Sequence, residues 1–438
     1  MSIPIPTQHR KSLDASWKEG IAASIMIAVT DYYFIPLALF LGAGPRQIGW
    51  LVAIPHLLGS FSQIFAANLV TKVTSRVRFL TQGACVQAAL LLPIAVLPFL
   101  GNGRRVYALI LAVIVFRVLG NLIGTVWGSL VSSYLTPEER GAYLGWRGKI
   151  SGFAGIVGLA IGGLLLAALK VFSISFAFFV VFLLPVAARF ASTFWMARME
   201  DVPVGPGGPD ARFSLIDFLR RFRESNFVKF VFYVALMTFS TQVASPYFSV
   251  YMLKNLHFTY VQYMLMHLAA VVSGLMAFPI WGRHADRVGN AQVMKLTGLI
   301  VPMIPLLWLM TREFYLLIVV ELFAGFMWSG FNLCSVNFIF DAVVPEKRMR
   351  CLSYFNLING TAIFLGASLG GYLAEHLPPL WGYKLYGVFL LSSALRYGSH
   401  FILSGGFKEV RGTVERITSR DLFFSVLGIR PVVGRDRV

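Results

Sequence analysis

Charged residues are scarce in this sequence of 438 residues. Asp, Glu, Lys and Arg together make up 13% of it, whereas a soluble globular protein has about 25%. Hydrophobic residues, at 57%, exceed the soluble average of about 45–50%. The composition therefore excludes an ordinary soluble domain.

Cysteine is also rare, and a nucleotide-binding loop is missing. Cys85, Cys334 and Cys351 lie far apart without CxxC spacing, so neither a disulfide framework nor a cysteine metal site is implied. The GxxxxGK[ST] pattern of P-loop ATPases does not occur. The apolar segments contain no metal-ligand cluster and no nucleophile beside a base. We therefore expect no enzymatic activity, no metal and no cofactor.

Long apolar runs are what the chain has in abundance. A helix needs about 20 apolar residues to cross a hydrocarbon core about 30 Å thick. The runs predict an all-α integral membrane protein with twelve transmembrane helices. The first run follows three basic residues, as a signal peptide does, but it contains Asp31 and lacks a small-residue cleavage site, so we expect a retained span. The predicted spans are 19–42, 48–71, 79–100, 106–133, 150–170, 172–197, 228–253, 259–281, 291–311, 314–341, 351–375 and 385–404.

Basic residues give the chain a net charge of +18, and they gather in alternate loops. Loops rich in Lys and Arg stay on the cytoplasmic side of a membrane. This asymmetry predicts a multi-pass protein of the inner (plasma) membrane with both termini cytoplasmic. The bilayer, and no nucleic acid, is then the partner of the basic residues. The loops that should lie outside keep only Arg46, Arg104, Arg105, Lys170, Lys254, Arg312 and Lys384.

The sequence repeats itself at an offset of 208 residues. Pro137-Glu-Glu-Arg140 aligns with Pro345-Glu-Lys-Arg348, and Gly162-Gly163 aligns with Gly370-Gly371. Two related six-helix bundles follow from this repeat. The predicted organisation is a cytoplasmic segment 1–18, a bundle 19–197, a linker 198–227, a bundle 228–404 and a basic tail 405–438. Aromatic and basic residues between 213 and 223 predict an amphipathic helix in the linker, although a solvated linker is the alternative.

The loop after the eighth predicted span carries the most specific motif. Gly282-Arg-His-Ala-Asp286-Arg287-Val-Gly289 resembles the GxxxDRxG loop of the major facilitator superfamily of secondary transporters. The resemblance covers residues 17 to 404, although the matching loop of the first half, 68–78, lacks the aspartate and the glycine. It implies alternating access, with spans one, four, seven and ten around a central cavity, and we expect a monomer.

Charge contacts at a cytoplasmic gate are a second implication of the resemblance. Gly282, Asp286, Arg287 and Gly289 would hold the outward-facing state through contacts between helices. The loops with Arg140 and Arg348 resemble the family's connections after spans four and ten and would belong to the same gate. The alternative for these two loops is ordinary surface charge beside a helix-ending proline.

Two opposite charges, Asp31 and Arg117, fall in the middle of the first and fourth spans. A lone charge there costs at least about 2.5–3.5 kcal/mol, so we expect them to pair. The segment Phe116–Asn121 resembles the fourth-span arginine motif of proton antiporters, with Gly120 at the usual glutamine position. Proton coupling through Asp31 and Arg117 is therefore predicted, and a static ion pair is the alternative.

Further polar residues in the spans are candidates for a substrate cavity, although each is equally suited to hydrogen bonds between helices. Arg189 and Arg396 are expected to extend to the cytoplasmic interface. The paired motifs from Gly158 and Gly366 resemble the family's GPxxGG motif without its proline, and their duplication favours close helix packing. The cavity candidates are Asn121, Gln63, Gln242, Trp328, Asn332 and Glu321.

Taken together, these features predict a secondary active transporter that moves a small solute, coupled to H⁺, and exports an amphipathic compound. An uptake permease or facilitator for a small polar or anionic solute is the alternative. A membrane receptor or membrane enzyme is a remote third candidate, because no large extramembrane domain is available.

Overall fold

The computed structural model describes residues 9–101, 103–202, 224–412 and 419–426. The predicted linker helix and most of the basic tail lie outside these residues. The chain divides into two compact units, residues 1–210 with 249–265, and residues 211–248 with 266–438. Each unit is described by itself below.

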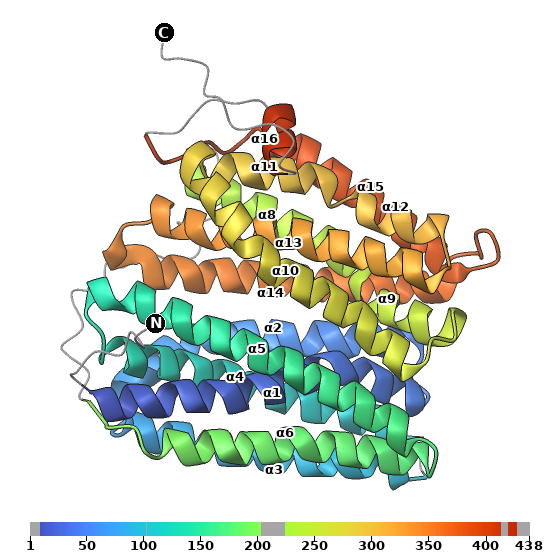
Figure 1. Ribbon diagram of the computed structural model, residues 1–438, viewed down its shortest axis with the longest axis horizontal. Helices are drawn as coiled ribbons and strands as arrows, with labels where there is room; N and C mark the ends of the chain where they lie inside the picture. Colours follow the sequence, from blue (N-terminus) through green and yellow to red (C-terminus); the bar gives the residue numbers. More distant parts are fainter. Residues whose placement is uncertain (1–8, 102, 203–223, 413–418, 427–438) are drawn as a thin grey trace. The chain divides into compact units, whose positions relative to one another are not determined.

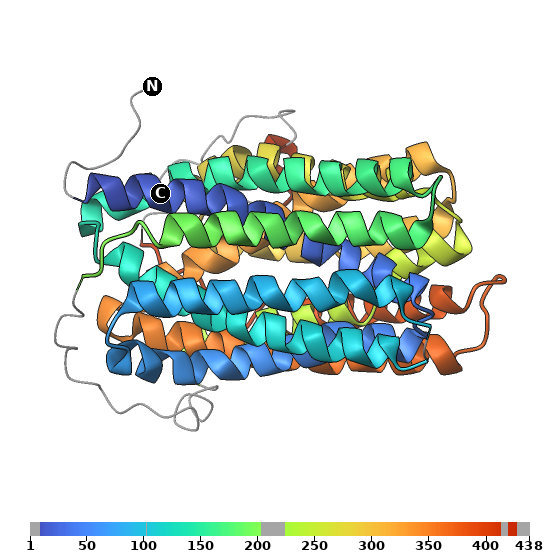
Figure 2. The ribbon, with the colours of Figure 1, turned by 90° about the horizontal axis from the view of Figure 1, so that it is seen from below.

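The first unit is built from long helices that lie side by side, coloured blue to green in Figure 1. α1 packs against α5 and α6, α3 against α6 and α4, and α2 against α4. Figure 2 shows these helices running along a common direction. The helices are α1 Arg10–Phe40, α2 Pro45–Lys72, α3 Arg76–Val96, α4 Arg105–Ser132, α5 Pro137–Leu169 and α6 Ile174–Met196.

The second unit repeats this pattern with more interruptions. α8 packs against α14 and α15, and α11 packs against α13. The short α9 and the π-turn at 251–255 lie in the connection that contributes residues 249–265 to the first unit. The helices are α8 Asn226–Gln242, α9 Ser245–Val250, α10 Tyr260–Val288, α11 Asn290–Ile300, α12 Met303–Met310, α13 Phe314–Ala342, α14 Pro345–His376, α15 Lys384–Leu403 and α16 Ser419–Val426.

The helical content agrees with the prediction of an all-α membrane protein. Outside its helices, the described part of the chain shows one isolated bridge, between Leu380 and Tyr383, and no β-strand. Ten helical segments among the described residues are long and apolar enough to cross a membrane. α2 and α15 are not among the ten, and both carry polar side chains, such as Gln63 in α2 and Arg396 in α15.

Proline breaks the ninth predicted span into α11 and α12. Pro305 has no N–H, so it cannot complete the helical hydrogen bond to the carbonyl of Val301. Arg396 donates to that carbonyl at 3.4 Å, and Ser393 donates to the carbonyl of Pro302 at 2.7 Å. Side chains of α15 thus donate to two main-chain carbonyls at the break.

The duplicated glycine motifs lie at matching close contacts in the two units. A Cβ at Gly162 would lie 2.6 Å from the ring of Tyr33, and one at Gly370 would lie 2.8 Å from the ring of Tyr247. The two tyrosine hydroxyls donate to carbonyls at the same offset, Tyr33 to Leu159 at 2.8 Å and Tyr247 to Ala367 at 3.2 Å. These contacts support the interpretation of both motifs as packing elements.

Candidate functional site

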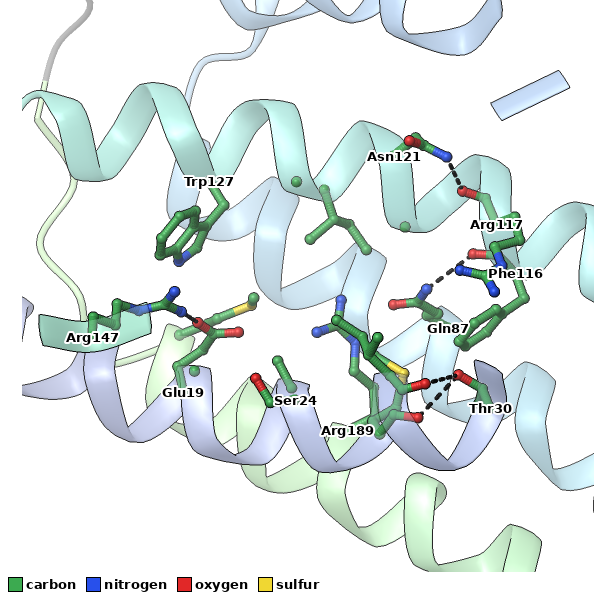
Figure 3. Close-up of a pocket in the computed structure, with 18 residues that line it drawn as sticks. Glu19, Ser24, Thr30, Gln87, Phe116, Arg117, Asn121, Trp127, Arg147 and Arg189 are labelled. Atoms are coloured by element: carbon green, nitrogen blue, oxygen red, sulfur yellow. Dashed lines mark hydrogen bonds and ion pairs between the residues drawn. The ribbon is translucent and has the colours of Figure 1, made fainter. Parts of the chain in front are cut away.

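A cavity of about 340 Å³ lies inside the first unit. Its lining comes mainly from α1, α3, α4, α5 and α6, and Figure 3 shows the polar side chains that face it. Three arginines line it, together with one carboxylate, two side-chain amides and two aromatic rings. These residues are Arg117, Arg147, Arg189, Glu19, Gln87, Asn121, Phe116 and Trp127.

One end of the cavity holds a buried ion pair. Arg147 donates to Glu19 at 2.7 Å, and their side chains are 15% and 4% exposed. The guanidinium of Arg147 also donates to the carbonyl of Ser16 at 3.0 Å and lies 4.1 Å from the ring centre of Trp127. A buried carboxylate at this position is compensated by both charge and hydrogen bonds.

Arg189 of α6 reaches the same network through a serine. It donates to Ser192 at 3.0 Å, and Ser192 donates to the second oxygen of Glu19 at 3.1 Å. Arg189 is 3% exposed, so the prediction that it extends to the membrane interface is wrong. Arg396 of α15 is 2% exposed and is likewise held inside, so the same prediction fails for it.

At the other end of the cavity, the structure brings Asp31 and Arg117 together. Arg117 of α4 donates to the carboxylate of Asp31 of α1, with side chains 27% and 38% exposed. Asn121 donates to the carbonyl of Arg117 at 2.9 Å, and Gln63 of α2 donates to Asn121 at 2.6 Å. Four of the predicted site residues therefore form one connected group.

The cavity candidates of the second unit do not form such a group. Glu321 lies beside the indole of Trp308. The guanidinium carbon of Arg396 lies 6.0 Å from the ring centre of Trp328. Gln242 packs against Gly366, and Asn332 is exposed. The role of these four residues in substrate binding stays a prediction.

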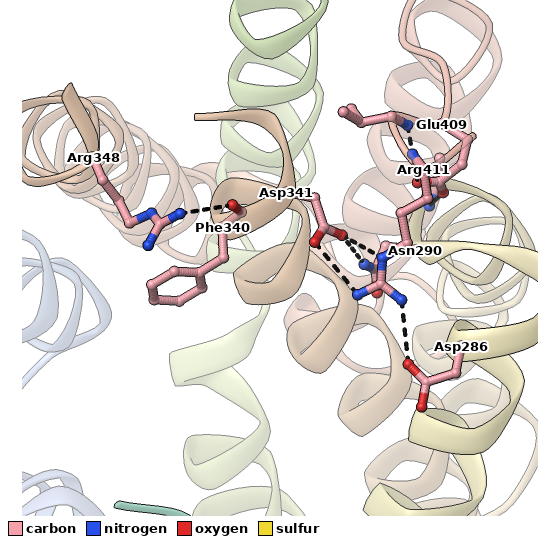
Figure 4. A network of polar contacts seen from close by, with 9 residues as sticks. Asp286, Asn290, Phe340, Asp341, Arg348, Glu409 and Arg411 are labelled. Atoms are coloured by element: carbon pink, nitrogen blue, oxygen red, sulfur yellow. Dashed lines mark hydrogen bonds and ion pairs between the residues drawn. The ribbon is translucent and has the colours of Figure 1, made fainter. Parts of the chain in front are cut away.

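The predicted gate motif lies at the junction of α10 and α11, and a residue of the tail contacts it. Arg411 donates to Asp286 at 3.2 Å and to Asp341 of α13 at 2.9 Å, and Asn290 donates to Asp341 at 2.7 Å (Figure 4). We call these four residues the Arg411 cluster. The pKa of Arg411 is raised, because hydrogen bonds and charges from the two aspartates outweigh the lowering effect of burial. Arg411 therefore stays cationic.

Arg287, the arginine of the same motif, is exposed and forms no ion pair within the described residues. Gly289 has a φ of 90°, which favours glycine, and it is the N-cap residue directly before α11. The N–H of Ala291 donates to Glu409 at 2.8 Å. Glu409 therefore satisfies a free donor at the start of α11.

A family model identifies this architecture. The model of the Major Facilitator Superfamily matches residues 20–311 and 230–423. The chain belongs to the major facilitator superfamily. It is therefore a multi-pass membrane transporter, and the predicted fold class and family are confirmed.

Solved structures of superfamily transporters share this fold at low sequence identity. The nucleoside transporter NupG has a TM-score of 0.68 and 13% identity, over 90% of this chain and 100% of its own. A bacterial homologue of the iron transporter ferroportin, in an inward-facing state, has a TM-score of 0.66 and 15% identity; the match covers 90% of this chain and 98% of the homologue. A bacterial homologue of the human lysosomal transporter Spinster has a TM-score of 0.65 and 12% identity; the match covers 90% of this chain and 97% of the homologue. No curated protein sequence matches the chain.

The two superfamily loops with Arg140 and Arg348 make the same contact in each unit. Arg140 donates to the carbonyl of Ser132 at 3.2 Å, and Arg348 donates to the carbonyl of Phe340 at 3.1 Å. Each arginine thus satisfies a carbonyl eight residues earlier, near the end of the preceding span. Both copies of this arginine therefore have a hydrogen-bond acceptor within their own unit.

The sequence analysis missed several residues that the structure places at the cavity or at the junction of α10 and α11. Glu19 and Arg147 stand near predicted span boundaries, where charges are common, so their pairing is visible only in the fold. Gln87 in the third span and Arg411 in the tail belong to no motif that we identified. No group of three or more potential metal ligands occurs among the residues that the structure describes.

Proposed function

We propose that this chain is a proton-coupled secondary transporter that moves a small polar solute by alternating access. The observation that carries the proposal is the Asp31–Arg117 ion pair beside the cavity of the first unit. Membrane spans hold ionisable residues mainly where they serve a transport pathway or a proton relay. The proposed location is the inner membrane, with both termini cytoplasmic, on the distribution of basic loops.

The ion pair offers a physical route to coupling. Protonation of Asp31 removes the negative charge beside Arg117, so the guanidinium becomes available to another acceptor. Asn121 and Gln63 add polar groups beside the pair, because Asn121 donates to the main-chain carbonyl of Arg117 and Gln63 donates to Asn121. A proton and a solute then bias the same conformational equilibrium, which is what coupling requires.

The cavity lining offers a polar solute several groups to bind. Three arginines, Glu19 and two amide side chains line it, beside apolar side chains such as Met26 and Ile123, so polar groups can fix the orientation of a solute there. Export of an amphipathic compound is the second candidate, supported by the partial arginine motif at 116–121 and by Trp127 and Phe116 in the lining.

The test replaces Asp31 by Asn, which keeps the side-chain size and removes the titratable charge. In vesicles with an imposed pH gradient, we expect D31N to lose gradient-driven accumulation while solute exchange across the membrane continues. Flux is measured with solutes that stabilise the purified protein in a thermal-shift screen. Unchanged dependence on the pH gradient would remove Asp31 from proton coupling.

A further inference from the structure

Arg189 is the one arginine of the cavity lining whose charge no carboxylate contacts directly. Glu19 neutralises Arg147, and Asp31 neutralises Arg117. Within the described part of the chain, Arg189 donates only to the hydroxyl of Ser192, although a guanidinium has five donors. Its Nε is buried and has no partner there. The lining therefore carries one positive charge in excess.

An unneutralised guanidinium inside the membrane is costly. Arg189 is 3% exposed, so neither water nor lipid headgroups screen it effectively. A ligand with one carboxylate would neutralise the charge, and the planar fork of arginine matches the two oxygens of that group. A dianion would bring a second negative charge that the lining does not balance.

Gln87 adds a second recognition element next to Arg189. Its amide N–H donates to the carbonyl of Phe116 at 2.9 Å, which fixes the orientation of the side chain. The carbonyl oxygen of Gln87 is buried and has no partner, and Figure 3 shows it directed toward Arg189. Only a hydrogen-bond donor on the ligand satisfies this oxygen.

Gly120 makes room for this arrangement. A Cβ at Gly120 would lie 2.9 Å from the side-chain nitrogen of Gln87. Position 120 is also where the resembled arginine motif has glutamine. In this chain, Gln87 of α3 thus places its amide against Gly120, and both residues line the cavity together with Arg117.

We propose that the cavity binds a small organic monoanion, a monocarboxylate that also carries a neutral hydroxyl donor, with Arg189 on its carboxylate and Gln87 on its hydroxyl. The inference names a substrate class for the transporter proposed above and rests on that function. The volume of about 340 Å³ is at the small end of the 300–1,000 Å³ range of ligand pockets.

The test measures equilibrium binding to the full-length protein in lipid nanodiscs. Three probes of similar size separate the two groups: 2-hydroxypropanoate, propanoate without the donor, and 2-hydroxypropanamide without the charge. We expect 2-hydroxypropanoate to bind about tenfold more tightly than propanoate, because propanoate leaves Gln87 unsatisfied. The amide should bind at least about tenfold more weakly than propanoate, because it leaves Arg189 unneutralised.

Variants assign the effects to residues. R189Q should abolish the preference for the carboxylates over the amide, whereas R189K should keep part of it, since lysine retains the charge but not the fork. Q87L should make 2-hydroxypropanoate and propanoate bind equally. R396Q is the matched control, because Arg396 is equally buried in α15 but lies outside the cavity, and it should leave all three affinities unchanged.

The outcomes separate this inference from the transport proposal. Equal binding of the three probes, no binding of any, or a carboxylate preference that survives R189Q overturns the substrate class. If binding follows the expected pattern but flux ignores the pH gradient, proton coupling fails and the substrate class stands. If R189Q does not fold, R189K and Q87L still decide the two recognition elements.

Discussion

At the scale of single residues, Glu19 decides the charge balance of the first unit. It lies on α1 between a direct contact to Arg147 and a serine-mediated contact to Arg189. Its side chain is 4% exposed, so removing its charge would leave the buried cation of Arg147 without compensation. Breaking a buried pair from one side is far costlier than replacing both partners.

We therefore predict strong coupling between Glu19 and Arg147. E19Q alone should lower the free energy of unfolding by about 3–5 kcal/mol, because Arg147 becomes an unpaired buried charge. The double variant E19Q/R147M should lose less than the sum of the two single variants. Thermal denaturation of the purified proteins measures all three, and additive losses would show that the two side chains do not interact.

At the scale of elements, glycine sets how closely α5 and α14 approach their neighbours. Gly162 meets the ring of Tyr33, a side chain that has some freedom to shift. Gly370 also meets backbone, since a Cβ there would lie 2.1 Å from the carbonyl oxygen of Val243. Backbone contacts are harder to relieve, because a whole helix must move.

This difference predicts unequal costs for the same substitution in the two halves. G370A should destabilise the protein by about 1–3 kcal/mol and more than G162A does. The control is G398A in α15, where a Cβ would meet nothing within 4 Å, and it should be neutral or slightly stabilising. Melting temperatures of the three variants check the order, and equal losses at 370 and 398 would contradict the packing role.

The junction of α10 and α11 is a second element whose behaviour depends on a distant segment. Arg411 links Asp286 and Asp341, while Glu409 holds the N–H of Ala291. The first unit has a matching contact, because Asp201, which aligns with Glu409 at the offset of 208, accepts the N–H of Arg76 at the start of α3. In each unit, therefore, a carboxylate of the segment that follows the sixth span accepts an N–H at the start of the third span.

We expect R411Q to loosen the junction, whereas R287Q should not. Loss of Arg411 leaves both aspartates without their cation, so amide hydrogen exchange of residues 286–291 should become faster. Arg287 forms no ion pair among the described residues and is the matched control in the same motif. Exchange that accelerates equally in both variants would argue against a specific role of Arg411.

At the scale of the whole molecule, the basic loops predict which face of the membrane each connection occupies. In a variant without its own cysteines, a single cysteine at position 103 should react with an impermeant maleimide added to intact cells. A single cysteine at position 412 should react only after permeabilisation. A Cβ at Gly103 or Gly412 would meet nothing within 4 Å, so neither change should disturb the fold. The reverse labelling pattern would invert the proposed orientation.

The sequence alone determined the class of the protein and its internal repeat. Continuous apolar runs of about 20 residues predict transmembrane helices, because a helix of that length crosses the bilayer and satisfies its own backbone hydrogen bonds. Arg140 and Arg348, like Gly162 and Gly370, are 208 residues apart, and the members of each pair make corresponding contacts in the two units. Such features are local or periodic, so they can be recognised from the sequence without knowledge of the tertiary structure.

Apart from the pair of Asp31 and Arg117, which their positions in the middle of two spans predicted, only the tertiary structure decided which charges compensate one another. Glu19, Arg147 and Arg189 are far apart in sequence, and each resembles an ordinary charge near a membrane interface until α1, α5 and α6 pack together. The same is true of Arg411, which finds its aspartates on α10 and α13. Ion pairs depend on distance in space, and packing of the helices sets that distance.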